Sequence, residues 1–94
     1  RHTPFMSEVI MEELVIRFES GVVEVFYAGR GDSDRFHIAQ LERCELLRLD
    51  SSRGPTFNLV AQQRGGASLT HIRMRPEQLP ELQQVVAEIN QAIG

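Results

Sequence analysis

A change in hydrophobic period near Pro76 constrains this 94-residue chain more than any other feature. Before Pro76, short segments alternate apolar and polar residues, which is typical of strands with one buried face. After it, apolar residues recur at steps of three and four, so they line one face of a helix. The chain is therefore predicted to fold as a β-meander followed by one amphipathic helix that covers part of the sheet. The apolar helix positions are Leu79, Leu82, Val86, Ile89 and Ile93.

Residues that favour turns divide the chain before Pro76 into about six predicted strands. Clusters rich in Gly, Pro, Asp and Ser lie at 29–34 and 50–55, and such residues tolerate the backbone angles of tight turns. Residues 35–39 and 41–49 are interpreted as two strands, with one bent strand or a short helical turn near Gln40 as the alternatives. The predicted strands are residues 13–18, 22–27, 35–39, 41–49, 56–61 and 69–74.

The predicted fold class is α+β, mainly β, with about six antiparallel strands and one C-terminal amphipathic helix as a cap. Strands that are apolar on one side, with glycine at their turns, favour a curved sheet or a partly open barrel, because curvature reduces the exposed strand edges. The 94 residues can bury one hydrophobic core and not two. We expect a single domain over residues 12–94, and we interpret residues 1–11 as a cloning remnant or flexible leader, with Met6 or Met11 as the natural start.

Charge and composition exclude several classes of function. The ten basic residues are all Arg, and with thirteen Asp and Glu they give a formal net charge of −3. The arginines are dispersed, so the chain lacks the basic face that a nucleic-acid binder needs. No apolar stretch approaches the roughly 20 residues of a membrane-spanning helix, and residues 1–6 lack the form of a secretory signal. The single Cys44 excludes an intrachain disulfide and is typical of a reducing compartment. We expect a cytoplasmic protein that binds no nucleic acid and does not insert into a membrane.

The residues able to carry out chemistry form no catalytic constellation in the sequence. Nucleophilic catalysis requires a Cys or Ser beside a His that a third group orients. Cys44 lies between Arg43 and Glu45 in a predicted strand and is interpreted as a small buried hydrophobic residue. His37 and His71 lie in different predicted strands, and no further ligand stands at a spacing that would complete a metal site. We predict no catalytic residue, no metal site, no cofactor and no enzymatic activity. The alternative hypothesis is a small ligand-binding or enzymatic domain with a pocket in the concave sheet face, lined by His37, His71, Cys44 and Tyr27.

Three predicted turns carry an Arg-Gly pair, and two of these arginines are candidates for an anion or acidic-peptide site. Successive turns of a meander alternate between the two ends of the sheet, so Arg30 and Arg53 are expected at one end and Arg64 at the other. Two arginines at one rim could hold an anion or a peptide carboxylate by charge-assisted hydrogen bonds. The alternative is that they are solvated turn residues, since aspartates in the same loops offset their charge and local ion pairs contribute only about 0–1 kcal/mol.

Two segments resemble those of a known family. Residues 35–46 (RFHIAQLERCEL) look like its strand, short bend and next strand, and residues 73–82 (RMRPEQLPEL) are similar to its last strand and the start of its capping helix. From about residue 12 to residue 93, the chain resembles the pleckstrin-homology-like (PH-like) domains of bacterial proteins. The resemblance implies a small curved β-sandwich or barrel that serves in binding, with the helix plugging one end.

The resemblance also bears on the partner. Some PH-like domains bind phosphoinositides through basic residues of the first hairpin loop, but the corresponding residues 19–21 here are Glu-Ser-Gly, so phosphoinositide binding is not expected. Bacterial relatives resemble protein-interaction or self-association modules. In addition, the predicted strands 22–27 and 41–49 are apolar on both faces, which exceeds what one helix can cover. We predict a non-catalytic binding module that binds a protein partner or forms a homo-oligomer.

Overall fold

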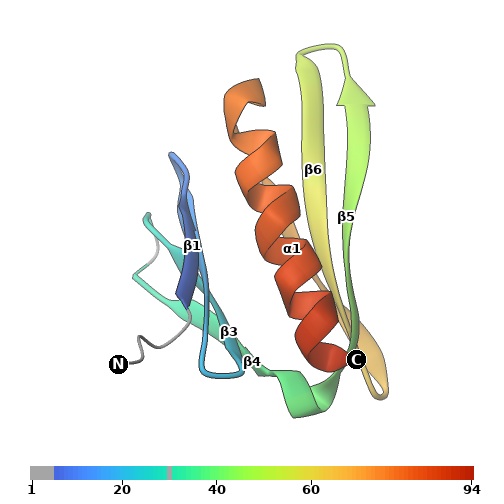
Figure 1. Ribbon diagram of the computed structural model, residues 1–94. Coiled ribbons are helices and arrows are strands. Elements are labelled where there is room, and N and C mark those ends of the chain that lie inside the picture. The colour runs from blue at the N-terminus through green and yellow to red at the C-terminus, as the bar shows by residue number, and fades with distance from the viewer. Residues whose placement is uncertain (1–5, 30) are drawn as a thin grey trace.

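The structure, a computed structural model, describes residues 6–29 and 31–94, which contain two antiparallel sheets and one long helix (Figure 1). The strand order is β1-β2-β3-β4 in the first sheet and β5-β6-β7 in the second. The strands are β1 (Met6–Ile10), β2 (Leu14–Glu19), β3 (Val22–Tyr27), β4 (Ser33–His37), β5 (Leu41–Ser51), β6 (Gly54–Gln63) and β7 (Gly66–Ile72). The helices are the short 3-10 turns η1 (Ile38–Gln40) and η2 (Pro76–Gln78) and the α-helix α1 (Leu79–Ile93).

The prediction of a mainly β chain with one C-terminal helix is confirmed, but the strands form two sheets in place of one curved sheet of about six strands. Pairing among the described residues stops at β1 and β4 in one sheet and at β5 and β7 in the other, so this part of the chain forms no closed barrel. The sheets separate at η1, where Ile38 N–H donates to the Gly21 carbonyl (2.9 Å) and His37 N–H donates to Gln40 Oε1 (3.3 Å). This short helical turn, one of the alternatives near Gln40, redirects the chain before β5 begins.

The first strand, β1, lies within residues 1–11, which the sequence pattern assigned to a remnant or leader. Its Val9 is 1% exposed and is in register with Ile16 of β2, and Met11 just beyond the strand is also buried. Val9 and Met11 therefore contribute to the hydrophobic core, and the folded unit includes residues before position 12. The interpretation of residues 1–5 as a cloning remnant lies outside the described residues.

The helix α1 lies across the opening between the two sheets (Figure 1). The predicted helical stripe is confirmed at Leu82 and Ile89, which are fully buried, but Val85 is the third buried position of the helix. Leu79 and Val86, which belong to the predicted stripe, are only half-buried. One core joins all three layers, and its largest fully buried side chains are Val9, Ile16, Val25, Ile72, Leu82 and Ile89.

Candidate functional site

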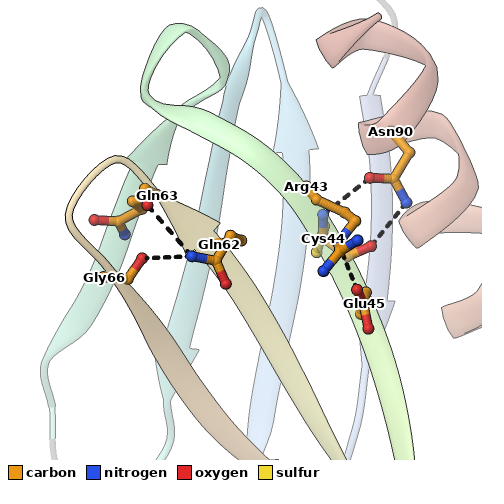
Figure 2. A network of polar contacts seen from close by, with 7 residues as sticks. All are labelled: Arg43, Cys44, Glu45, Gln62, Gln63, Gly66 and Asn90. Carbon is orange, nitrogen blue, oxygen red and sulfur yellow. Dashed lines mark hydrogen bonds and ion pairs between the residues drawn. The ribbon is translucent and has the colours of Figure 1, made fainter.

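The strand β5 is an edge strand of the second sheet, and its outer edge faces α1 at Cys44. Across residues 6–29 and 31–94, β6 is the one strand that pairs with it. At Cys44, the side-chain amide of Asn90 bonds to both backbone groups (Figure 2). Cys44 N–H donates to Asn90 Oδ1 (2.9 Å), and Asn90 Nδ2 donates to the Cys44 carbonyl (2.8 Å). Both backbone groups of Cys44 therefore point away from β6 and toward the helix.

The direction of the Cys44 backbone determines the direction of the backbone further along β5. In an antiparallel pair, residues alternate between those whose N–H and C=O groups face the partner strand and those whose groups face away. The pairing of β5 with β6 is irregular between Leu41 and Arg43 and then continuous to Ser51. The residues of β5 that share the outward direction of Cys44 are Leu46, Arg48 and Asp50.

A groove of about 470 Å³ lies between α1 and the helix-facing side of β5 and β6. Leu46 and Arg48 direct their side chains to the groove face, so a strand added beside β5 would direct its alternate side chains there too. Arg48 is the charged residue of the lining; 61% of its side chain is exposed, and its Nε lies 3.1 Å from Asp50 Oδ1. The lining residues are Leu46, Arg48 and Phe57 of the sheet and Leu79, Gln83, Val86, Ala87 and Asn90 of the helix.

Asn90 is the residue of this site that sequence reasoning missed. It lies four residues after Val86 and three before Ile93, so it stands on the flank of the apolar stripe. A half-buried amide at such a position needs a hydrogen-bond partner, and this requirement is the signal that could have drawn attention to it. Its partner, the backbone of Cys44, lies 46 residues earlier in the chain and is not visible in the sequence.

The thiol of Cys44 lies at the same junction between β5 and α1. Burial raises its pKa from 9.0 to about 11, and the Glu45 carboxylate contributes to the increase. The thiol is therefore protonated near neutral pH, and a protonated, buried thiol is a weak nucleophile. The interpretation of Cys44 as a small buried hydrophobic residue is confirmed by its 2% exposure.

The four residues predicted for a concave ligand pocket are only partly brought together. Tyr27 and His71 line one hollow of about 540 Å³ at the junction of β3 and β7. Cys44 is buried beside α1 in the second sheet, and His37 is exposed at the end of β4 in the first sheet.

The Tyr27 and His71 side chains in this hollow contact neighbouring residues. The Tyr27 hydroxyl donates to Asp34 Oδ2 (2.8 Å) and lies 3.4 Å from the Thr70 hydroxyl, which links the first sheet to the second. His71 Nδ1 lies 3.0 Å from Asn58 Oδ1 on the adjacent strand β6. The Tyr27 contact therefore joins the two sheets, whereas the His71 contact lies within the second sheet.

The structure describes one of the two arginines predicted for an anion or acidic-peptide site. Arg53 lies exposed in the turn between β5 and β6, beyond the end of β5 that carries Arg48. Arg30 lies outside the described residues, so the predicted pairing of Arg30 with Arg53 lies outside them as well.

The outer faces of the two sheets differ in charge. Across the first sheet, Glu8, Arg17, Glu24 and Arg35 are register neighbours on four successive strands. Arg17 Nη2 lies 2.9 Å from Glu8 Oε2, and Arg35 Nη2 lies 2.8 Å from Glu24 Oε2. Hydrogen bonding to Glu8 raises the pKa of Arg17 above its ordinary value. By contrast, the outer face of the second sheet exposes three leucines: Leu47 (44%), Leu49 (45%) and Leu69 (67%).

No cluster of three or more His, Cys, Asp or Glu side chains within residues 6–29 and 31–94 is arranged to hold a metal ion. In the same part of the chain, no helix has the length and apolar character to cross a membrane. Comparisons of the sequence with protein-family models, with curated proteins and with solved structures found no match.

Proposed function

We propose that this chain is a non-catalytic, PH-like binding module in which an extended segment of a protein partner adds to the outer edge of β5. The segment forms backbone hydrogen bonds with Leu46, Arg48 and Asp50 and places alternate side chains in the groove beside α1. The observation that carries the proposal is that β6 is the one strand paired with β5 among the described residues, and that Leu46 and Arg48 of this edge strand line a largely apolar groove.

Strand addition explains why these two features belong together. An edge strand presents a row of backbone donors and acceptors that can pair with another chain. In such complexes the main-chain bonds provide affinity, and pockets for alternate side chains provide specificity. In this groove Leu46, Phe57 and Val86 offer apolar contacts and Arg48 offers a positive charge. The expected segment has apolar residues at alternate positions and one acidic residue that reaches Arg48 in competition with Asp50.

The element order supports the PH-like part of the proposal. Two meanders of four and three strands are followed by a terminal helix that is bonded to β1 and to β5. We propose that the two sheets form a partly open barrel that this helix plugs. We also propose that the protein is located in the cytoplasm. Phosphoinositides are not the proposed ligand, because the β2–β3 turn at Ser20 and Gly21 carries no basic side chain.

A second copy of the chain is the other partner class, and the exposed leucines on the outer face of the second sheet favour it. Light scattering over a concentration series tests this candidate. A dimer that Leu69→Ser dissociates would support self-association through that face. A monomer at every concentration would leave the partner segment as the occupant of β5. Binding of a small ligand at the hollow lined by Tyr27 and His71 is the remaining alternative.

The proposal is tested with peptides selected from a displayed library of random 12-residue sequences. Affinity of the synthesised peptides is measured by fluorescence anisotropy for the wild type and for Arg48→Glu. We expect Arg48→Glu to weaken binding of an acidic peptide about tenfold, which corresponds to about 1.4 kcal/mol. The reason is that the substitution places a like charge opposite the acidic residue of the peptide.

Arg43→Glu is the matched control for this experiment. Arg43 lies on the same strand but on the opposite face, and its side chain is 65% exposed, close to the 61% of Arg48. Each of the two arginines is paired with an acid two residues further on, Arg43 with Glu45 and Arg48 with Asp50 (Figure 2 shows the first pair). Failure to select any peptide, or equal weakening by both substitutions, would contradict the proposed site.

A further inference from the structure

The bonds between Asn90 and Cys44 occupy backbone groups that a longer docked strand would need. In an antiparallel ladder, two residues of a hydrogen-bonded pair exchange both of their N–H and C=O groups. The Asn90 amide accepts from Cys44 N–H (2.9 Å) and donates to the Cys44 carbonyl (2.8 Å), so one side chain satisfies both backbone groups of Cys44. The side chain therefore takes the place that one residue of an added strand would occupy.

We infer that Asn90 is a positioning residue that ends the docking edge of β5 at Cys44 and thereby sets the register and length of the docked segment. The inference rests on the proposed function, because it concerns the same edge. Pairing is then limited to Leu46, Arg48 and Asp50, so the paired stretch of a docked segment spans about five residues.

The position of the helix supports this limit. A strand added to β5 must lie about 4.8 Å from it. At Cys44 that space holds the end of the Asn90 side chain, which reaches β5 from α1 (Figure 2). Further along the strand, Leu46 and Arg48 line the groove. A docked segment can therefore enter beside Arg48 but cannot continue in register past Leu46 while Asn90 is bound to Cys44.

Amide hydrogen exchange measured by NMR, residue by residue, tests the inference. In the free wild type we expect the Cys44 amide to be protected by Asn90, and the Leu46 and Arg48 amides to exchange at least about tenfold faster. A synthetic peptide selected from the random 12-residue library is expected to protect Leu46, Arg48 and Asp50. Protection of Cys44 should not change when the peptide binds.

The variant Asn90→Ala should reverse the pattern at Cys44. Without peptide, its Cys44 amide is expected to exchange about as fast as that of Leu46; with peptide, Cys44 becomes protected together with Leu46, because the docked strand extends by one pair. Gln83→Ala, which removes another amide from the same groove wall, is the control and should leave the Cys44 pattern unchanged. A merely structural role of Asn90 would not produce new protection of Cys44 by the peptide.

The outcomes separate this inference from the proposed function. If the peptide protects Leu46 and Arg48 but never Cys44 in Asn90→Ala, the inference is wrong and the docking site stands. If no selected peptide protects Leu46 and Arg48, the proposed function fails, and the inference fails with it. If Asn90→Ala does not fold, the wild type still decides: contacts between the bound peptide and the backbone of Glu42, beyond Cys44, would overturn the limit, and contacts that stop at Leu46 would support it.

Discussion

The two flanks of α1 are attached to the sheets in different ways. On the flank toward β1, Gln78 Nε2 at the start of the helix donates to the Ile10 carbonyl (2.8 Å). Ten positions further toward the C-terminal end, in the third turn of the helix, the Ser7 hydroxyl donates to the Glu88 carboxylate. Because Ser7 and Ile10 lie near opposite ends of the short strand β1, this flank is held at two separated points.

On the flank toward β5, the Asn90 side chain bonds to Cys44 near the C-terminal end of the helix, and the groove occupies the space toward its N-terminal end. Between the two flanks, the helix residues Leu82, Val85 and Ile89 are buried in the hydrophobic core. The helix therefore closes the core and still leaves a groove along one flank. The following predictions test how different the two flanks are.

The largest expected difference in stability is between a substitution at the buried centre of the helix and one on its flank toward β5. Ile89 is 0% exposed, and replacing it with Ala should lower the free energy of unfolding by about 2–5 kcal/mol, because both the transfer free energy and the packing around the cavity are lost. Val86 is half-buried at the groove wall, so Val86→Ala should cost only about 1 kcal/mol. Urea denaturation measures both values, and equal losses would show that the groove is not open to solvent.

The next effect concerns the hydrogen bonds between Asn90 and Cys44, which close the flank toward β5 at one end. Asn90→Ala leaves the N–H and C=O of buried Cys44 without their partner, so the free energy of unfolding should fall by about 1–3 kcal/mol. Gln83→Ala on the same wall should change it by less than about 0.5 kcal/mol, because Gln83 is exposed. Urea denaturation at pH 7 compares the two variants. A loss for Asn90→Ala no greater than that for Gln83→Ala would mean that solvent replaces the bonds to Cys44.

Much of the fold could be predicted from local patterns. The predicted strand at residues 13–18 corresponds closely to β2, and the predicted period change after Pro76 corresponds to the start of the helical region. The division into two sheets could not be predicted, because it depends on the contact of Ile38 with Gly21 on an earlier hairpin. The strand β1 was missed because its apolar residues Met6, Val9 and Ile10 do not alternate regularly with polar residues.

The candidate site was less predictable than the fold. Apolar surface on both faces of residues 41–49 correctly indicated exposed leucines, but the groove exists only because α1 crosses beside β5. The predicted candidates Arg30 and Arg53 were chosen from turn positions, whereas the groove takes its charge from Arg48 in the middle of a strand. The orientation of the helix relative to β5 is a property of the tertiary packing, and no local spacing encodes it.

A smaller effect tests whether water is excluded from the end of the β5 flank at which Asn90 bonds to Cys44. The pKa of Cys44 is about 11 in the folded protein, above its ordinary value of 9.0, so the folded state retains the proton at a pH where the unfolded state loses it. Its contribution to stability is therefore complete below about pH 9 and is lost as the pH rises toward 11. We expect a decrease of roughly 1 kcal/mol between pH 9 and pH 10, measured by urea denaturation. Cys44→Ala should abolish this part of the pH dependence, and its persistence in that variant would assign the decrease to other groups.

The smallest expected effect lies on the flank toward β1. Hydrogen bonds from Gln84 and Ser7 lower the pKa of Glu88 below its ordinary value of 4.5, so the folded state favours the ionised carboxylate. This contribution to stability is present above pH 4.5 and is lost as the pH falls through the lowered pKa of the folded state. Glu88 is half-buried, so solvent still screens its interactions in part. We therefore expect Glu88→Gln to reduce only slightly the loss of stability between pH 6 and pH 3, as measured by urea denaturation. If Glu88→Gln lowered the free energy of unfolding at pH 7 as much as Asn90→Ala does, one side chain would contribute equally to stability on each flank. The two flanks of the helix would then differ only in the groove beside β5.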